Sequence, residues 1–400
     1  MQTRLDPKIR QSRHAEAIES ILRKCVHCGF CNATCPTYQL CGDELDGPRG
    51  RIYQMKQYFE GEPANAEMLK HLDRCLTCRS CETTCPSGVR YSHLLEIGKE
   101  MIEGDLPRSR FDRLRRAAIV RFINSGWVFA SAIRIGQALA WMLPPPLRRS
   151  VPARQVALPR SQAQHSRKVL MLAGCVQPAL TPNTNTRAIN LLDKLGIEVI
   201  ELQQNLCCGA AAMHTSEPDY ALRQVKQLID QWWPHIEAGV EAIVVTATGC
   251  GVNVRDYARL LGDDPAYADK AARVSSLYRD LIEVVEAHSD ALEVPAAAGR
   301  RVAVHTPCTM QHGLGLNLRV ERLLAGVGYQ ICRIEEAHLC CGSAGTYSML
   351  QPAIASQLRQ NKLRALAVDL PDVIATANIG CQLQLAQGAS TPVVHWIELV

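Results

Sequence analysis

The feature that most constrains this 400-residue chain is a cysteine pattern that occurs twice, fifty positions apart. The run C-x2-C-x2-C-x3-C-P extends from Cys25 to Pro36 and again from Cys75 to Pro86. This spacing is typical of the ligands of a pair of [4Fe–4S] clusters. We therefore predict that the N-terminal part folds around two such clusters and that the chain transfers electrons.

The two cysteine runs are expected to share their ligands. Three closely spaced cysteines wrap one cubane, and in ferredoxins with two clusters the fourth cysteine ligates the other cluster. The predicted sets are Cys25, Cys28, Cys31 and Cys85 for the first cluster, and Cys75, Cys78, Cys81 and Cys35 for the second. Gly29 is expected to let the backbone approach the cluster, and Val26 and Leu76 to provide apolar cover.

Structural zinc and disulfide bonds account less well for these cysteines. Structural zinc sites use four ligands, commonly in C-x2-C pairs, and each run here exceeds that need. Disulfide frameworks belong to short secreted chains. The first residues, MQTRLDPK, lack the apolar core of an export signal, so we expect a cytosolic chain with reduced thiols.

Residues 1–105 are predicted to form a helix-rich, ferredoxin-like domain with two [4Fe–4S] clusters. Apolar residues recur at helical spacing over 8–24, and a turn at Asp46-Gly47-Pro48 precedes a predicted helix over 49–59. Further helices are expected around 64–74 and over 92–102. The long helical insert between the two runs favours a helical domain over a compact β-containing one.

Residues 106–167 are predicted to be a basic helical segment followed by a Pro-rich linker. Residues 106–168 carry thirteen lysines and arginines but one acid, Asp112, although the whole chain has a net charge of only +5. A helix or helix pair is expected over 109–143, broken at Ser125-Gly126. This helical segment either packs over the protein core or contacts another subunit, or else it contacts a membrane surface. No nucleic-acid-binding motif accompanies the charge, so no nucleic-acid partner is expected.

The remaining chain is predicted to be a tandem pair of α/β repeats with parallel sheets. The expected domains are 168–262 and 301–400, joined by a connector over 263–300. Continuous apolar strands alternate with helices in each repeat, and the cysteine spacing recurs. Cys175 to Cys207 spans 32 positions, as does Cys308 to Cys340, and each repeat contains a Cys-Cys-Gly (CCG) motif.

Each repeat is expected to gather four cysteines at the carboxyl edge of its sheet, where α/β folds bind ligands. The two sets are Cys175, Cys207, Cys208 and Cys250, and Cys308, Cys340, Cys341 and Cys381. The leading hypothesis is a further iron–sulfur cluster in one or both repeats. Zinc, a redox-active dithiol and a relic without function are the alternatives.

The other candidate residues carry weaker signals. His27 lies in the first cluster loop, and His305 and His338 lie near the second CCG set. They are interpreted first as ordinary surface, strand-end or loop histidines, and second as proton donors or ligands. Cys41 and Cys332 are interpreted as structural. The sequence contains no recognisable nucleotide-binding motif and no candidate catalytic residue, so a separate flavoprotein is expected to supply the electrons.

The motifs together resemble the iron–sulfur subunits of bacterial glycolate oxidases along essentially the whole chain. The segments that carry the resemblance are the two cluster loops, DELDGPRGRIY, HLCCGSAGTY, TANIGCQ and VVHWIEL. The resemblance implies an electron-transfer subunit whose two FAD-domain partner subunits oxidise glycolate to glyoxylate. It also implies a quinone or another acceptor and a place on the cytoplasmic face of the inner membrane, where contact through 106–168 is one of the alternatives for that segment.

Related architectures leave alternative functions open. The chain also resembles subunits of lactate-utilisation systems, anaerobic glycerol-3-phosphate dehydrogenase and heterodisulfide reductase. In the last family a C-x-x-C pair ends each CCG repeat, whereas Asn253 and Gln384 stand at those positions here. That departure argues against a thiol-disulfide reductase.

Overall fold

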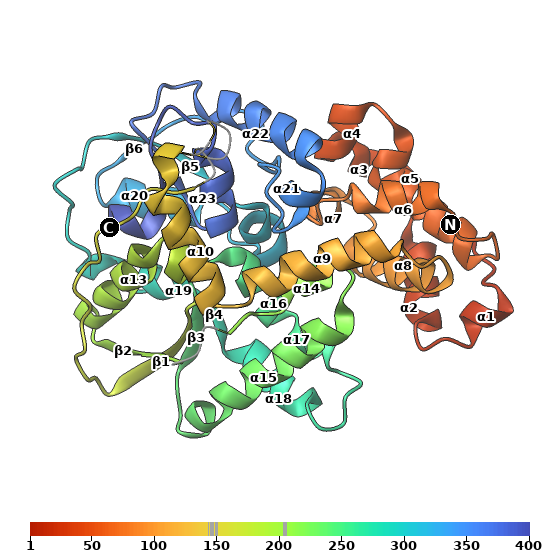
Figure 1. Ribbon diagram of the computed structural model, residues 1–400, viewed down its shortest axis with the longest axis horizontal. Helices are drawn as coiled ribbons and strands as arrows, with labels where there is room; N and C mark the ends of the chain where they lie inside the picture. The colour runs from red at the N-terminus through yellow and green to blue at the C-terminus, as the bar shows by residue number, and fades with distance from the viewer. Residues whose placement is uncertain (143, 145–147, 149–150, 203–205) are drawn as a thin grey trace.

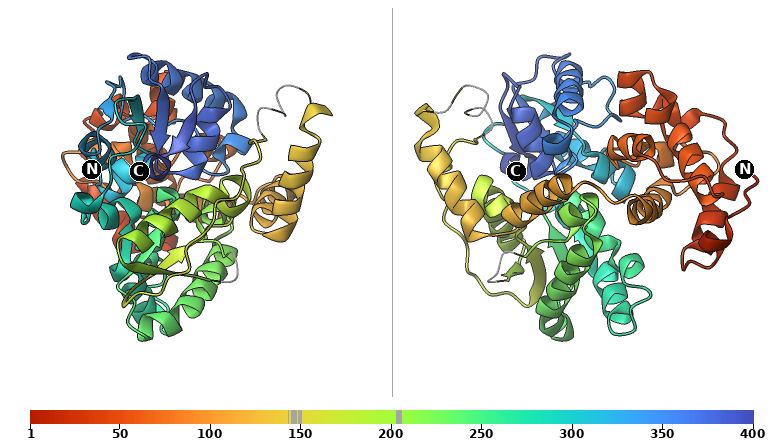
Figure 2. Two further views of the ribbon diagram at one scale, coloured as in Figure 1. Left: turned by 90° about the vertical axis from the view of Figure 1, so that its left-hand side faces the viewer. Right: turned by 45° about the vertical axis from the view of Figure 1, so that its right-hand side comes forward.

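The computed structural model describes residues 1–142, 144, 148, 151–202 and 206–400 (Figure 1). A helical N-terminal domain lies at one end of the molecule, and two α/β halves lie together at the other. Figure 2 shows α9 and α10 along the outside of the molecule. The sequence-based prediction of a helical ferredoxin-like domain followed by two α/β repeats is confirmed.

The N-terminal domain consists of short helices around the two cysteine loops. Its elements are α1 (Pro7–Arg10), α2 (Ala15–Lys24), α3 (Phe30–Ala33), α4 (Pro36–Cys41), η1 (Glu44–Asp46), α5 (Pro48–Phe59), α6 (Ala66–Asp73), α7 (Ser80–Thr84) and α8 (Tyr91–Asp105). Helices α2, α5, α6 and α8 bury an apolar core that includes Ile18, Met55, Phe59 and Leu94. The predicted helix over 8–24 is interrupted, because Ser12 Oγ donates to Ile9 O at 2.7 Å and competes with the helical bonds.

The first α/β half contains a four-stranded parallel sheet in the order β2-β1-β3-β4. Its strands are β1 (Arg167–Leu172), β2 (Ile197–Glu201), β3 (Ala242–Val245) and β4 (Tyr278–Asp280). Its helices are α12 (Gln177–Leu180), α13 (Pro182–Lys194), α14 (Ala210–His214), α15 (Pro218–Glu237), α16 (Thr248–Arg255), α17 (Tyr257–Leu260), α18 (Ala268–Leu277) and α19 (Leu281–Glu286), followed by η3 (Ser289–Ala291).

The second half repeats this topology, with the parallel order β6-β5-β7-β8. Its strands are β5 (Arg301–His305), β6 (Gln330–Ile331), β7 (Val373–Thr376) and β8 (Val393–His395). The other elements are η4 (Thr309–Leu314), α20 (Arg319–Gly326), α21 (Tyr347–Leu350), α22 (Pro352–Leu366), α23 (Ile379–Ala386) and η5 (Trp396–Leu399).

The segment expected to be a connector belongs to the first half. Strand β4, within 263–300, pairs with β3 and completes the first sheet, so this sheet extends beyond the expected boundary at residue 262. Helix α19 then packs against α20 of the second half. Leu281, Ile282 and Val285 of α19 join one apolar core with residues of both sheets, such as Val169 and Val304. The two halves therefore share a core and form a single body.

The basic segment forms two helices, α9 (Arg110–Ile123) and α10 (Trp127–Ala138), followed by η2 (Ala140–Met142). The break at Ser125-Gly126 is confirmed, and the helices are bent by 85°. Among the described residues, no single helix has the length and apolar content to cross a membrane; this pair meets both criteria only jointly. The predicted Pro-rich linker lies partly outside the described residues.

Candidate redox sites

Both cysteine loops have the same backbone shape, which follows from left-handed residues at matching positions. His27 and Gly29 have φ values of 61° and 88° in the first loop, and Thr77 and Arg79 have 51° and 61° in the second. Alternating left-handed residues turn successive N–H groups to one side and form a concave anion-binding loop. A Cβ on Gly29 would lie 2.7 Å from Arg49 Nη1, so a larger residue here would have to displace that side chain, whereas the second loop has Arg79 at the matching position.

The first cavity collects the cysteines of the first predicted cluster. Cys25, Cys28 and Cys31 line it together with Cys85, which comes from the other loop. Cys81 also lines this cavity, at the boundary between the two sites. The structure thus brings together the ligand set that the crossed arrangement requires.

The second cavity is the counterpart of the first. Cys75, Cys78 and Cys81 line it with Cys35 from the first loop. Tyr91 Oη donates to Cys75 Sγ at 3.6 Å. Crossing ties the two loops together, so each predicted cluster would depend on residues from both ends of the domain.

The thiols in both cavities are suited to metal rather than to surface chemistry. Burial raises the pKa of Cys31 to about 11, and it raises the pKa values of Cys78 and Cys81 well above the usual thiol value. Such thiols are protonated without metal, and metal binding displaces their protons. Four converging thiols in an apolar cavity fit a [4Fe–4S] cluster, and no disulfide joins them.

The two cluster loops differ in what covers them. Val26 and Leu76 occupy equivalent positions, but Val26 is 67% exposed whereas Leu76 is 4% exposed. Leu76 packs against Tyr347 and Leu358 of the second α/β half. Both residues line their cavities, as expected, but Leu76 is covered in turn by the second half whereas Val26 stays open to solvent. The first site faces outward, and the second faces the rest of the chain.

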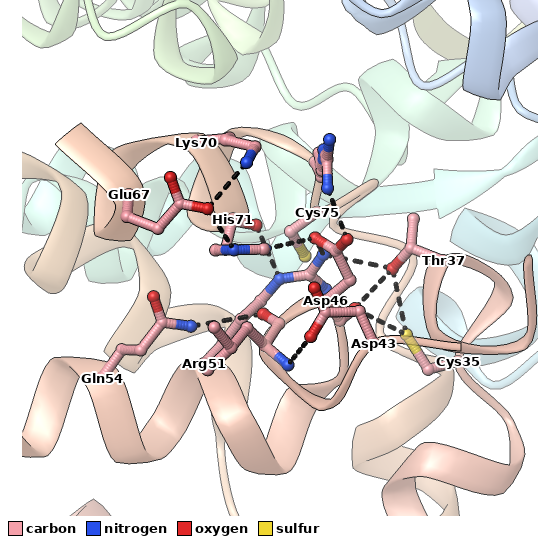
Figure 3. Close-up of polar contacts among 12 residues, drawn as sticks. Cys35, Thr37, Asp43, Asp46, Arg51, Gln54, Glu67, Lys70, His71 and Cys75 are labelled. Carbon is pink, nitrogen blue, oxygen red and sulfur yellow. Dashed lines mark hydrogen bonds and ion pairs between the residues drawn. The ribbon is translucent and has the colours of Figure 1, made fainter. Parts of the chain in front are cut away.

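A buried ionic network, which was not predicted from the sequence, lies beside the second cavity (Figure 3). Arg51 is 1% exposed, and it donates from Nε to His71 O at 2.7 Å and from Nη2 to Thr37 Oγ1 at 3.2 Å. Asp46 accepts from Arg74 Nη1 at 2.6 Å, and its Oδ1 lies 2.8 Å from His71 Nδ1. The clue in the sequence was the pair Asp46 and Arg51 inside the segment DELDGPRGR, although Arg74 and His71 lie outside it.

The charge of Arg51 is directed toward the second cavity. Burial lowers the pKa of Arg51, but nearby acidic groups, among them Tyr91, Cys75 and Cys35, outweigh it and raise this pKa above its usual value. Thr37 Oγ1 links the guanidinium to the cavity, since it lies 3.3 Å from Cys35 Sγ. A permanent positive charge therefore lies next to thiolates that would hold a negatively charged cluster.

The four cysteines of the first CCG set are also brought together. Cys175 follows β1, Cys207 and Cys208 follow β2, and Cys250 lies in the first turn of α16. Hydrogen bonds from the thiols of Cys175 and Cys208 hold the pKa of Cys207 well below its usual value. Cys208 in turn contacts Cys250. The predicted convergence at the carboxyl edge of the sheet is thus observed as a continuous row of sulfurs.

The second CCG set has its sulfurs in the same order as the first, and a histidine side chain lies beside them. Cys308 Sγ lies 3.9 Å from Cys340 Sγ, and Cys341 contacts both Cys340 and Cys381. The ligand atoms of His305, Cys341 and Cys381 all lie within 4.8 Å of one another. His305 is buried, and burial lowers its pKa to about 3. Of the two histidines singled out near this set, the structure places His305 at the sulfurs.

The remaining candidates lie apart from the CCG sulfurs, and His27 lines the first cavity. His338 Nε2 lies 3.8 Å from Glu336, and His27 stacks on Tyr53 with ring centroids 5.9 Å apart. Cys332 is buried in the core of the second half, whereas Cys41 is exposed.

The residues that replace the C-x-x-C cysteines form backbone hydrogen bonds. Asn253 Nδ2 donates to Cys208 O at 2.6 Å, and Gln384 Nε2 donates to Ala355 O at 3.1 Å. The Asn253 amide holds the loop at Cys208, and the Gln384 amide holds helix α22; neither adds a thiol.

The second ferredoxin site and the second CCG set are neighbours. Cys78 and Cys308 both pack against an apolar cluster that contains Cys340 and Leu76. Around them, Tyr347 Oη donates to Arg74 O at 3.0 Å, and Thr83 Oγ1 lies 2.8 Å from His312 Nδ1. The cysteine sites thus follow one another, from the exposed first cavity through the second cavity to the second CCG set.

Comparison with known proteins agrees with this arrangement. Residues 21–89 match the 4Fe-4S dicluster domain, and residues 169–255 and 302–386 each match a cysteine-rich domain. The chain is 49% identical to the glycolate oxidase iron-sulfur subunit of Escherichia coli over 100% of this chain and 98% of that protein. It is 29% identical to the probable glycolate oxidase iron-sulfur subunit of Bacillus subtilis, over 92% and 89% of the two chains.

A more distant relative matches a smaller part of this chain. Lactate utilization protein A of Bacillus subtilis is 26% identical over 54% of this chain and 90% of its own length. The ferredoxin loops, both cysteine-rich repeats and the segment between them are all present in the full-length match. The chain therefore belongs to the family of glycolate oxidase iron–sulfur subunits.

Proposed function

We propose that this chain is the electron-transfer subunit of a complex that oxidises glycolate to glyoxylate. The observation that carries the proposal is the full-length match at 49% identity, which includes both cysteine-rich repeats. Bound [4Fe–4S] clusters supply one-electron transfer, which divides the two electrons of a reduced flavin into single steps. The chain itself contributes the thiol ligands, the burial of the second site and the positive charge of Arg51.

The flavin is proposed to reside in two FAD-domain partner subunits that bind at the exposed first site. Phe30 is 61% exposed there, beside the exposed Val26 and Cys28. The equivalent face of the second loop is covered within the chain by Tyr347 and Leu358. An apolar rim that its own chain leaves open at a redox site suits a protein partner.

The electron acceptor is proposed to be a quinone or another acceptor, with the complex peripheral on the cytoplasmic face of the inner membrane. One face of α9 and α10 packs inward through Val120 and Phe129. Large apolar side chains are exposed along this segment, including Trp127 of α10 at 78% and Trp141 of η2 at 76%. Exposed tryptophans among arginines are typical of helices that lie in the headgroup region of anionic membranes.

The substrate is tested on the complex with its flavoprotein subunits. Co-expressed and co-purified subunits should reduce a quinone analogue with glycolate much faster than with lactate or glycerol 3-phosphate, and glycolate should bleach the cluster absorbance. Faster reduction by lactate or glycerol 3-phosphate would reassign the donor. Disulfide reduction by the isolated chain would favour the thiol-disulfide reductase instead.

Membrane contact is tested separately by vesicle flotation. The chain should bind vesicles that contain anionic phospholipid, and Trp127→Ser with Trp141→Ser should weaken this binding at least several-fold. Leu370→Ser is the matched control, since Leu370 is 77% exposed on another surface. Equal binding by the double variant and the control would refute contact through these helices.

A further inference from the structure

The second α/β half carries one chemical group that the first half lacks. His305 lies three residues before Cys308, whereas Leu172 lies three residues before Cys175. The two residues occupy the same place in the repeated fold. Each ends the strand that lies second in its sheet, and Leu172 pairs with Val245 as His305 pairs with Thr376. The two cysteine sets are therefore not chemically equivalent.

The imidazole of His305 is placed as a ligand would be. A ring nitrogen of His305 and the sulfurs of Cys341 and Cys381 lie mutually within 4.8 Å, and all three residues are buried. Within the described part of the chain, His305 Nε2 has no hydrogen-bond partner. A buried polar atom without a partner is unfavourable, so a group that uses this nitrogen would remove the penalty.

The surrounding backbone and amide groups are suited to thiolates. Gly342 N donates to Cys340 Sγ at 3.4 Å, and Asn378 Nδ2 donates to Cys381 Sγ at 3.5 Å. Donors of this kind stabilise ligand charge and tune a metal centre. With Cys308 at 3.9 Å from Cys340, the row offers four sulfurs and one nitrogen.

The position of this set distinguishes a redox centre from a structural one. Thiolates with an imidazole suit zinc as well as iron–sulfur clusters. Cys78 and Cys308, however, pack against the same apolar cluster around Cys340, so the set lies next to the second ferredoxin site. A one-electron carrier beside it gives an iron–sulfur centre a partner for exchange, which zinc would not use.

We propose that the second half binds an iron–sulfur centre that has His305 as a nitrogen ligand beside Cys341 and Cys381, and that this centre accepts electrons from the second ferredoxin cluster. In this step one electron leaves the reduced ferredoxin cluster, which is oxidised, and reduces the new centre by one electron. Replacing a thiolate by neutral imidazole removes negative charge, which raises the potential and favours this direction.

The test uses the full chain, purified without oxygen, labelled with ¹⁵N-histidine and reduced with dithionite. We expect an electron paramagnetic resonance signal beyond the two ferredoxin signals, with coupling to a directly bound histidine nitrogen. His305→Leu should abolish that coupling and shift or remove that signal while both ferredoxin signals remain. Leucine is the residue that the first half accepts at this place, so the fold should tolerate it.

His338→Ala is the matched control, because His338 lies in the same region but pairs with Glu336. It should leave all signals unchanged. Zinc in place of additional iron, a third signal without nitrogen coupling, or a coupled signal that survives His305→Leu would each overturn the proposal. Because dithionite supplies the electrons, these outcomes are independent of the substrate of the complex.

Discussion

Replacement of Arg51 by methionine should lower the reduction potential of the second ferredoxin cluster. Arg51 is buried, and its Nη2 lies 3.2 Å from Thr37 Oγ1, which lies 3.3 Å from Cys35 Sγ. The guanidinium is thus within about 7 Å of the predicted cluster edge. Reduction adds negative charge there, so a fixed positive charge stabilises the reduced form and its removal disfavours reduction.

Coulomb's law sets the size of this effect. A unit charge at about 7 Å with an effective dielectric constant of about 20 contributes about 2.4 kcal/mol. For one electron this free energy corresponds to about 100 mV. Solvent that enters the cavity reduces the value, so we expect a decrease of roughly 50–100 mV for the second cluster and a much smaller decrease for the first.

The assay is a redox titration of the purified chain that is followed by electron paramagnetic resonance. Arg51→Lys keeps the charge and should shift the potential far less than Arg51→Met. Arg49→Met is the matched control, since Arg49 lines the first cavity and not the second, so any shift should fall on the first cluster. An unchanged or raised potential of the second cluster in Arg51→Met, or equal shifts for methionine and lysine, would refute the electrostatic argument.

Three further predictions concern the contacts of Cys85, Asp73 and Asn253. Cys85→Ser should damage the cluster held by Cys25, Cys28 and Cys31, and loss of only the other signal in electron paramagnetic resonance would contradict crossed ligation. Asp73→Asn should weaken the docking of α9 by about 3–5 kcal/mol, measured by hydrogen exchange over 110–123, because Asp73, whose side chain is only 10% exposed, pairs with Lys99, Arg108 and Arg116. Burial alone would raise the pKa of Asp73, but these cations lower it below its usual value. The docking is therefore full above about pH 4 and weakens as the pH falls from the unfolded-state pKa toward the lower folded-state pKa. Asp73→Asn should remove that pH dependence, and an unchanged pH dependence in the variant would contradict the pairing. Asn253→Ala should cost about 1 kcal/mol in the free energy of unfolding by denaturant titration, through loss of the bond to Cys208 O, and a stabilised variant would disprove this role.

Much of the fold was predictable because its signals are local. Alternating strands and helices with parallel sheets were predicted for both halves from continuous apolar runs and the repeated cysteine spacing, and each half contains such a sheet. Strand β4 was missed, because three residues of mixed character carry no periodic signal. The first sheet selects this segment through its pairing with β3, which is a tertiary interaction.

In the candidate sites, too, some features could be predicted from local sequence and others could not. The four-cysteine sets were predicted, since the spacing of ligands in a short loop reflects the geometry of the cluster. The buried Arg51 network was not, because an arginine in a helix usually faces solvent and nothing near it in sequence indicates burial. The place of His305 among the sulfurs was one of two open interpretations, and only the packing of β5 beside β7 distinguished it from His338.

The amino-acid sequence alone specified which kind of redox group the N-terminal domain binds. Two C-x2-C-x2-C-x3-C-P runs specify iron–sulfur ligation, because each loop is short enough for its own residues to set its shape. The spatial order of the two ferredoxin cavities and the second CCG set depends on the tertiary structure. This structure buries Leu76 and exposes Val26, although both occupy the same place in equivalent loops, and it sets Cys78 beside Cys340. Such contacts join residues more than 250 positions apart, and they depend on how whole domains pack rather than on any local pattern.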